Sequence, residues 1–306
     1  EIRFSVENAK RIYEPIEAED ENTWVKLIKK PLGVVVALVP WNVPYTITMV
    51  KLSSALITGN TLVVKPSPYS SIGLSLALQK MPQVFPPGVI NVIHGEADVG
   101  AALVTHPLVR KITLTGGGKT AKRIMKLAAE SLTRVHFELG GNDPAILLDD
   151  VNLEEAIPKI VRGVFYRSGQ VCIAIKRVYV PQTLFQKACD LFCQYVDQFK
   201  IGHGLDKQAT FAPVNNNHQY QYVKSLINKA KQSGAKVLEL GTRLHPEEWD
   251  NGYYIHPTVV IDPDPAHEVV VEEQFGPVIP IVPYHSEEEV IQWANQTEYG
   301  LGSSIW

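Results

Sequence analysis

Short apolar runs rich in β-branched residues alternate with helical segments between residues 34 and 140, and this rhythm limits the possible folds most strongly. Strands are predicted at residues 34–39, 61–64, 89–93, 111–114 and 135–137. Helices are predicted between them, at residues 45–57, 71–80, 97–104 and 120–132. Strands that alternate with helices build βαβ units, so the sequence predicts an α/β fold with a doubly wound, mainly parallel sheet.

The chain is predicted to divide into an arm and two domains. Residues 1–33 are charged, and a short helix followed by an alternating strand at residues 24–29 suits a surface arm or an edge strand. Residues 34–140 form the predicted dinucleotide-binding domain. Residues 141–306 begin a second series of strands and helices, which predicts a second α/β domain.

Composition and charge exclude several classes of protein. The 306 residues are 45% hydrophobic and 20% charged, which is typical of a globular protein and excludes a disordered or fibrous chain. The net charge of -3 comes without a basic stripe, so we expect small-molecule partners rather than nucleic acid or a membrane. Three cysteines provide no disulfide framework, and the apolar runs are too short to span a bilayer. We therefore expect a cytoplasmic protein.

The segments that follow the predicted strands are polar or glycine-rich. In a doubly wound sheet, ligands bind outside the carboxyl ends of the strands. The four segments there are Pro40-Trp41-Asn42, Lys65-Pro66-Ser67, Thr115-Gly116-Gly117-Gly118 and Glu138-Leu139-Gly140-Gly141. We therefore expect ligand-binding residues to come from these segments.

A glycine turn follows the fourth predicted strand. Gly116-x-Gly118-x-x-Ala121 opens a helix, and Glu138 stands 20 residues after Gly118 at a strand end. This spacing fits a dinucleotide fingerprint in which the acid holds a ribose, so Glu138 is either a ribose ligand or a catalytic base. The phosphate loop of nucleotide triphosphatases is excluded, because Thr113 occupies the position of its first glycine. A plain tight turn is the alternative for the glycines.

Cys172 is the candidate nucleophile. It follows a turn at Gly169 and precedes a strand-like run at residues 176–181. A thiol reacts as the thiolate, which needs a polar or electropositive and partly open setting. The alternative is a buried structural cysteine that packs as a small hydrophobe.

Two polar side chains at strand ends are candidate binding groups. Pro66 holds Lys65 extended, where its ammonium can bond ribose hydroxyls or a phosphate, the alternative being a solvated surface lysine. Asn42 ends the first strand, where its amide can donate to a developing oxyanion or bond its own turn.

The other two cysteines, Cys189 and Cys193, lie four residues apart on a predicted helix at residues 184–199. Their spacing lacks the paired ligands of a structural zinc site, so we expect a thiol-lined core face and no metal.

Six motifs occur in the order seen in the aldehyde dehydrogenase superfamily, which the chain resembles over nearly its whole length. They are Pro40-Trp41-Asn42-Val43-Pro44, Lys65-Pro66-Ser67, Phe137-Glu138-Leu139-Gly140-Gly141, Gly169-Gln170-Val171-Cys172, Glu273-x-Phe275-Gly276-Pro277 and Asn295-x-x-x-Tyr299-Gly300-Leu301. The resemblance is to dimeric or tetrameric members that oxidise aldehydes to acids. It implies an aldehyde substrate, NAD or NADP as cofactor, and a homo-oligomer.

The resemblance also implies a role for each matched residue. Cys172 would attack the aldehyde carbon, Asn42 would hold the oxyanion, and Glu138 would activate the water that hydrolyses the thioester. Lys65 would bond the adenosine ribose and Glu273 the nicotinamide ribose. The full set of implied cofactor contacts is Pro40, Trp41, Lys65, Ser67, Pro68, Thr115, Gly116, Gly117, Leu139, Gly140, Glu273 and Phe275.

The sequence departs from the family pattern at several positions. Pro68 stands where an acid that binds ribose hydroxyls is often found, which leaves the choice between NAD and NADP open. Ala121 replaces the second glycine of the turn, and Gly117 stands where serine is common. Arg167 replaces the usual asparagine before the nucleophile turn, where a cation can lower the pKa of the thiol or simply be solvated.

Family members begin before Glu1 and continue beyond Trp306, through segments that complete the substrate tunnel and cross to neighbouring subunits. The chain therefore resembles a shortened member. Its alternative is a non-redox role for the same fold, as an esterase, a cyclisation or isomerisation catalyst, a binding module or a structural subunit.

Overall fold

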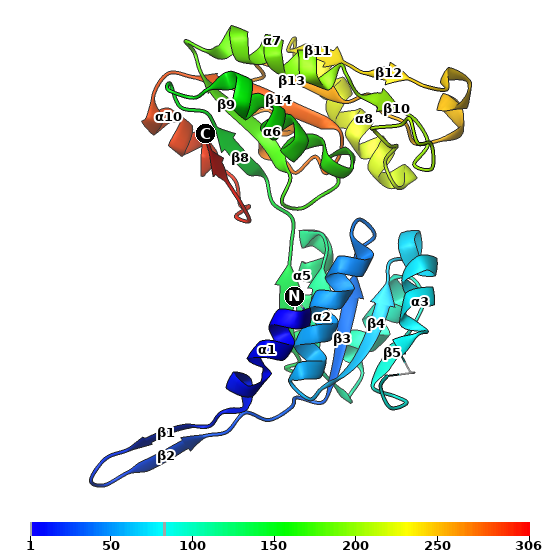
Figure 1. Ribbon diagram of the computed structural model, residues 1–306, viewed down its shortest axis with the longest axis vertical. Coiled ribbons are helices and arrows are strands. Elements are labelled where there is room, and N and C mark those ends of the chain that lie inside the picture. The colour runs from blue at the N-terminus through cyan, green and yellow to red at the C-terminus, as the bar shows by residue number, and fades with distance from the viewer. Residues whose placement is uncertain (1, 82–83) are drawn as a thin grey trace. The chain divides into compact units, whose positions relative to one another are not determined.

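The computed structural model describes residues 2–81 and 84–306, and the chain forms two compact units (Figure 1). The first unit ends at Leu139 and the second begins at Gly140. In each unit, helices pack on a mainly parallel sheet, so the predicted α/β class is confirmed.

Five parallel strands form the sheet of the first unit, in the order β5-β4-β3-β6-β7. They are β3 (Val34–Val39), β4 (Thr61–Pro66), β5 (Ile90–Val92), β6 (Val109–Thr115) and β7 (Arg134–Glu138). The helices between them are α2 (Pro44–Ile57), α3 (Ser71–Leu78), α4 (Ala97–Thr105) and α5 (Gly118–Ala129), with the short helix η1 (Pro68–Ser70) before α3. Each predicted strand and helix of this unit is present, and only the ends differ, by a few residues.

Alternate residues of the central strand β3 face opposite sides of the sheet. Val35, Ala37 and Val39 cluster with apolar residues of α2 and α3. Val36 and Leu38 cluster with apolar residues of α4 and α5. Side chains of a strand alternate between faces, so an unbroken apolar strand needs helices on both sides. The sheet is therefore doubly wound, as predicted.

A helix and an exposed hairpin precede this sheet. The helix α1 (Ile2–Tyr13) is tied to α2 by the Tyr13 hydroxyl, which donates to the Ile57 carbonyl at 2.8 Å. Strands β1 (Ile16–Glu19) and β2 (Trp24–Leu27) pair antiparallel, and each of their residues is exposed (Figure 1). This hairpin lies within residues 1–33, for which a surface arm or an edge strand is predicted. Strand β1 is not predicted from the sequence, and its alternating pattern extends over only four residues.

Six strands form the main sheet of the second unit, in the order β11-β13-β14-β9-β8-β15. They are β8 (Asp143–Ile146), β9 (Ile175–Pro181), β11 (Lys236–Glu239), β13 (Thr258–Ile261), β14 (Val278–Tyr284) and β15 (Ser304–Ile305). Only β11 pairs antiparallel to its neighbour. The short strands β10 (Lys200–Ile201) and β12 (Thr242–Arg243) form a separate parallel pair.

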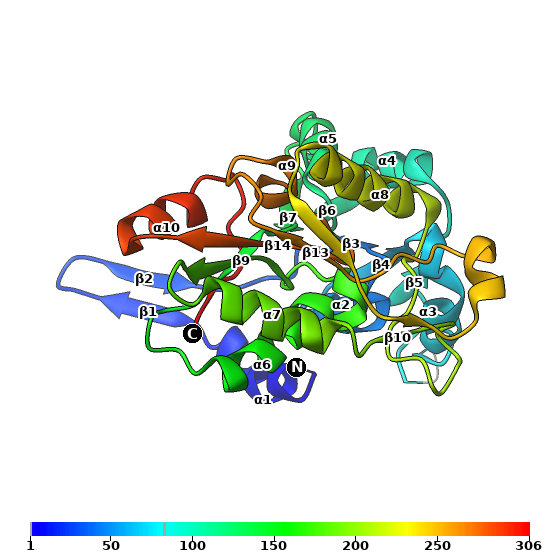
Figure 2. The ribbon, with the colours of Figure 1, turned by 90° about the horizontal axis from the view of Figure 1, so that it is seen from above.

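Helices cover both faces of this second sheet (Figure 2). The helices are α6 (Leu153–Phe165), α7 (Phe185–Val196), α8 (Asn217–Gln232), α9 (Glu268–Val271) and α10 (Glu287–Ala294), with the short helices η3 (Tyr166–Gly169) and η4 (Pro246–Asn251). Apolar side chains of α6 and α7 form one core with β9 and β14. Those of α8, α9 and α10 form a second core on the opposite face.

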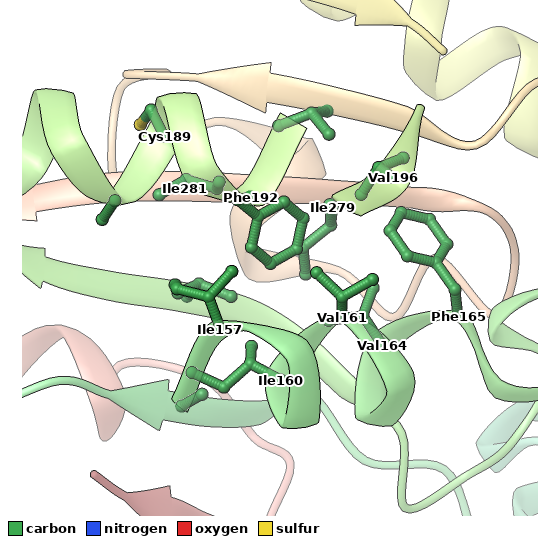
Figure 3. Close-up of a cluster of buried hydrophobic side chains, with 14 of the residues drawn as sticks. Ile157, Ile160, Val161, Val164, Phe165, Cys189, Phe192, Val196, Ile279 and Ile281 are labelled. Atoms are coloured by element: carbon green, nitrogen blue, oxygen red, sulfur yellow. The ribbon is translucent and has the colours of Figure 1, made fainter. Parts of the chain in front are cut away.

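Cys189 belongs to the core beneath α6 and α7. It is 2% exposed and lies with Phe192 and Ile157 in that cluster (Figure 3), while Cys193 packs at its border. The predicted thiol-lined core face is confirmed. Among residues 2–81 and 84–306, each helix falls short of the length or apolarity that crossing a bilayer requires.

A matched pair of isoleucines tests the core assignment of the second unit. Ile160 on α6 is fully buried, whereas Ile291 on α10 is 56% exposed. We expect Ile160→Ala to lower the free energy of unfolding by about 2–5 kcal/mol, because a cavity adds to the lost apolar transfer. Ile291→Ala should change it by less than about 0.5 kcal/mol. Urea unfolding followed by circular dichroism measures both, and equal effects would contradict the assignment.

Candidate functional site

The first group of candidate residues lies where the strand order of the first sheet reverses. The chain passes from β3 to β4 on one side and later to β6 on the other side of β3. Ligand crevices in doubly wound sheets form at such a point, outside the carboxyl ends of the strands. Asn42 follows β3 and Gly116 follows β6, so both lie at this edge of the sheet. Pro40, Trp41 and Asn42 are each partly buried.

The turn between β6 and α5 offers a place for an anionic group. The Thr115 hydroxyl is buried and has no hydrogen-bond partner within the described part of the chain. Gly117 is the N-cap of α5 and provides no side-chain cap, and among the described residues no atom beyond the adjoining backbone lies within 4 Å of the Cβ position of Gly117 or Gly118. Helix N-termini carry free N–H groups and a partial positive charge that attract phosphate. These residues therefore fit the pyrophosphate of a dinucleotide.

Lys65 is buried at the end of β4, so it is not the solvated surface lysine of the alternative interpretation. It is 8% exposed, and its Nζ lies 3.5 Å from the Pro66 carbonyl. Burial lowers the pKa of Lys65, while the carboxylates of Glu96 and Asp98 oppose that effect. A buried ammonium near the strand end keeps its capacity to donate to ligand oxygens.

Ser67 and Pro68 begin the short helix η1. The Ser67 hydroxyl accepts a hydrogen bond from the Tyr69 N–H at 3.4 Å, which makes Ser67 the N-cap. Pro68 occupies the first helical position, where a missing N–H costs nothing. Both residues therefore have a local structural role beside the predicted cofactor role.

Glu138 is the last residue of β7, at the same edge of the sheet as Gly116. Its side chain is 54% exposed, and its Oε1 lies 3.4 Å from Nε2 of His136. Its carbonyl accepts a hydrogen bond from the Gly116 N–H at 3.0 Å. The glycine turn and the candidate base are thus joined through the backbone, and the exposed carboxylate is open to water.

A buried lysine, Lys51, interacts electrostatically with Glu138. The Nζ of Lys51 donates to the Thr113 hydroxyl at 2.8 Å, and Lys51 is 7% exposed. Burial lowers the pKa of Lys51 to about 8, although Glu138 raises it and Lys111 lowers it further.

The second group of candidate residues centres on the turn before Cys172. Three consecutive residues have left-handed backbone angles, with φ of 52° at Arg167, 57° at Ser168 and 73° at Gly169. Such angles are costly for residues with a side chain and persist only where the surroundings enforce them. Here the Ser168 hydroxyl donates to the Ala212 carbonyl at 2.6 Å, and the Gln170 side-chain oxygen accepts a hydrogen bond from the Asn215 N–H at 2.8 Å.

Gly169 fits only because it lacks a side chain. A Cβ there would collide with the carbonyl oxygen of Gly276, so the backbone of the Cys172 turn packs directly on the segment that carries Glu273 and Phe275. Phe275 itself has a left-handed φ of 47°. Two motifs 100 residues apart in the sequence are therefore interlocked through their backbones.

Glu273 packs against the glycines that begin the second unit. Its carboxylate occupies the space that a Cβ on Gly140 would fill, and its Oε1 accepts from the Gly141 N–H at 3.2 Å. The carbonyl oxygen of Cys172 lies 3.2 Å from the Cβ position of Gly141. The second unit thus brings together Gly140, Cys172 and Glu273, whereas the remaining candidates up to Leu139 belong to the first unit.

The thiol of Cys172 is half-buried, and burial raises its pKa. The Ile173 N–H and the ammonium of Lys176 act in the opposite direction, and Glu273 raises the pKa further. The neighbouring cation is therefore Lys176. Arg167 instead has its guanidinium carbon 5.7 Å from the centre of the Tyr166 ring.

Sequence reasoning missed Lys176. The signal was present, because Lys176 and Arg177 interrupt the apolar run of β9, and both are only 2% exposed. A charged pair inside a strand that is otherwise apolar indicates buried partners.

Within the described residues, no group of three His, Cys, Asp or Glu side chains is placed to hold a metal ion.

Comparison with known proteins adds independent evidence. All 306 residues match the aldehyde dehydrogenase family profile. The chain is 37% identical over 288 residues to the putative aldehyde dehydrogenase FUS7 of Gibberella fujikuroi, covering 94% of this chain and 60% of that protein. It is 39% identical over 279 residues to the putative aldehyde dehydrogenase DhaS of Bacillus subtilis, covering 90% of this chain and 56% of that protein. The chain thus spans about 60% of the length of these curated relatives.

Solved structures agree with the sequence relatives. A mutant of aldehyde dehydrogenase C from Pseudomonas syringae, complexed with NAD+ and octanal, matches with a TM-score of 0.90 and 30% identity, over 99% of this chain and 63% of that chain. An NADP dependent enzyme from Escherichia coli matches with a TM-score of 0.91 and 33% identity, over 99% of this chain and 63% of that chain. The fold of this chain is therefore shared with enzymes that use either dinucleotide.

Two glycines with similar backbone angles test the interlocked turn. Gly169 and Gly234 have φ of 73° and 86°, but only Gly169 has a backbone atom in its Cβ position. We expect Gly234→Ala to cost about 1 kcal/mol of unfolding free energy from strain alone. Gly169→Ala should cost about 2–4 kcal/mol, because overpacking adds to strain. Denaturant titration measures both, and a Gly169→Ala cost no larger than that of Gly234→Ala would contradict the close backbone contact.

The buried Lys51 predicts a pH dependence of stability. Its pKa is about 8 in the folded protein against 10.5 ordinarily, so the folded state releases its proton first as pH rises. Between pH 8 and 10.5 the unfolded chain binds more protons, and stability contributed by this site therefore rises with pH. We expect wild type to gain up to about 3 kcal/mol over Lys51→Met across that range. The exposed Lys119→Met serves as control, and a flat difference for Lys51→Met would contradict the burial of its charge.

Proposed function

Because the chain belongs to the aldehyde dehydrogenase family, we propose that it oxidises an aldehyde to a carboxylic acid with NAD or NADP as cofactor. One observation carries the proposal: the turn that presents Cys172 is interlocked by its backbone with the segment that carries Glu273. The nucleophile and a predicted cofactor ligand are thereby built into one rigid substructure. Membership in this family favours the redox reaction over the non-redox alternatives for the fold.

The first step is the attack of Cys172 on the substrate. The thiol releases its proton to solvent, and the sulfur forms a bond to the aldehyde carbon while the carbonyl electron pair moves onto oxygen. The resulting oxyanion accepts hydrogen bonds from the Asn42 amide and from the Cys172 backbone N–H. Preorganised donors of this kind stabilise the developing charge, and removing one typically costs about 10²–10³ in rate.

In this proposal the contacts to the dinucleotide follow, residue by residue, from the resemblance to the family. Lys65 bonds the adenosine ribose, Thr115, Gly116 and Gly117 line the pyrophosphate at the N-terminus of α5, and Glu273 bonds the nicotinamide ribose. The remaining contacts come from Pro40, Trp41, Ser67, Pro68, Leu139, Gly140 and Phe275. When bound, the dinucleotide supplies the acceptor for the hydride that leaves the thiohemiacetal carbon. The buried, unpartnered hydroxyl of Thr115 and the open N-terminus of α5 support this assignment.

The last step is hydrolysis of the thioester on Cys172. Glu138 removes a proton from water, the oxygen attacks the thioester carbon, and the carbon–sulfur bond breaks to return the thiolate. The half-exposed carboxylate of Glu138 supports this role, because a general base needs access to water.

The proposal extends to the setting of the enzyme. We infer a small-molecule aldehyde as substrate, a cytoplasmic location and a homo-oligomeric state. The exposed hairpin of β1 and β2 supports an oligomer, because a two-stranded hairpin is only marginally stable by itself. The choice between NAD and NADP is left to direct measurement with each cofactor.

Two variants test the assignment of Cys172 and Glu138. With an aldehyde and NAD or NADP, wild type should produce reduced cofactor continuously, measured by absorbance. Cys172→Ala should produce none, because no thiohemiacetal forms. Glu138→Gln should give a burst of about one equivalent and then a steady rate lowered about 10²–10⁴-fold, since only the release step loses its base.

Cys193→Ala is the matched thiol control, because Cys193 packs at the border of the hydrophobic core. Its activity should stay within about twofold of wild type. Turnover by Cys172→Ala, or an absence of reduced cofactor from wild type with both dinucleotides and a panel of short, long and aromatic aldehydes, would overturn the proposal.

A further inference from the structure

The buried side chain of Lys176 is anchored to the segment that carries Cys172. Its Nζ donates to the carbonyl oxygens of Val171 at 3.0 Å, Cys172 at 2.6 Å and Ala174 at 3.1 Å. Lys176 is 2% exposed, so these bonds form away from bulk water. Three of the four residues 171–174 are thus tied to one nitrogen at the start of β9.

The geometry of these three bonds fits the charged form of Lys176. An ammonium has three N–H donors and no acceptor, which matches three carbonyl oxygens. A neutral amine has only two N–H donors, and its lone pair would face one of the carbonyls. Burial lowers the pKa of Lys176, but the nearby carboxylates of Glu273 and Asp143 favour the charge.

Two carboxylates, those of Glu273 and Asp143, interact electrostatically with the ammonium of Lys176. The Oε1 of Glu273 lies 3.7 Å from its Nζ, and Asp143 is 5% exposed. Burial raises the pKa of both Glu273 and Asp143, while Lys176 lowers the pKa of each. Arg177 points elsewhere, because its guanidinium donates to carbonyls of residues 142, 293 and 294. Lys176 is therefore the cation that faces Cys172.

We propose that Lys176 is a positioning residue whose ammonium holds residues 171–174 in place and electrostatically favours the thiolate of Cys172. The inference rests on the proposed function in one respect, which is the role of Cys172 as the nucleophile. On ionisation the sulfur keeps the electron pair of its S–H bond and the proton passes to solvent. The ammonium, held 2.6 Å from the Cys172 carbonyl oxygen, then attracts the negative sulfur of the same residue in a half-buried site, where such attraction is stronger than in water.

Alkylation of Cys172 by iodoacetamide tests this proposal without aldehyde or cofactor. The rate is measured from pH 6.5 to 10.5 by mass spectrometry of the Cys172 peptide, with the Cys193 peptide as internal reference. Alkylation follows the thiolate fraction, so its midpoint reports the pKa and its plateau reports access. Failure of the proposed dehydrogenase activity therefore leaves this test intact, and the two can fail separately.

Removal of the charge should move the midpoint. We expect Lys176→Met to alkylate about tenfold more slowly than wild type at pH 8, which corresponds to one pKa unit, with the same plateau. Lys176→Arg keeps the charge and should stay within about threefold of wild type. The electrostatic role would be overturned if the alkylation midpoint of Lys176→Met is unchanged. It would also be overturned if Lys176→Met and Lys176→Arg lose the same amount of plateau rate and neither shifts the midpoint.

Two further variants keep the test decisive if Lys176→Met does not fold. Lys176→Gln retains a neutral donor for the carbonyls and should shift the midpoint upward as Lys176→Met does. Glu273→Gln removes the negative charge that opposes Lys176, so Cys172 should alkylate several-fold faster at pH 8. Circular dichroism confirms folding of each variant. A midpoint that stays constant in both would overturn the proposal.

Discussion

The close contact between the backbones of Gly169 and Gly276 is the constraint on which the architecture of the Cys172 site depends. It requires a residue without Cβ and a left-handed turn, and the turn then directs the chain through Cys172 into β9. The same contact seats this turn on the segment that carries Glu273. A thiol and a carboxylate 101 residues apart are therefore placed by backbone packing rather than by flexible side chains.

In the first unit, the order of the strands in the sheet determines where the candidate site residues lie. The apolar side chains of β3 alternate between two helix layers, so the strand must be central, with β4 and β6 on either side. That order places Asn42 and Gly116 at the carboxyl ends of neighbouring strands. The Gly116 N–H is in turn bonded to the Glu138 carbonyl. Burial of apolar strands thus determines the positions of polar residues that do not contribute to the core.

Buried cations occur in both units, and their burial is the feature of the protein that is hardest to predict from the sequence. Lys51, Lys65, Lys176 and Arg177 are each at most 8% exposed. Each is tolerated because hydroxyl or carbonyl oxygens compensate the loss of hydration. From sequence alone a lysine is expected to be solvated, since partners that make burial possible come from distant segments. The role of Lys176 follows only from those partners.

The sequence by itself determined the α/β class, nearly every strand and helix of the first unit, and the family, because apolar periodicity and motif order are local properties. It also identified Cys172, Glu138 and Asn42 as candidates for catalysis, which stay proposals. Tertiary structure decided what surrounds them. It showed that Lys176, and not Arg167, is the cation that acts on the Cys172 thiol. It also showed a strand, β1, that pairs with β2 in the N-terminal arm. These contacts join residues far apart along the chain, and no local pattern encodes which distant groups will compensate a buried charge.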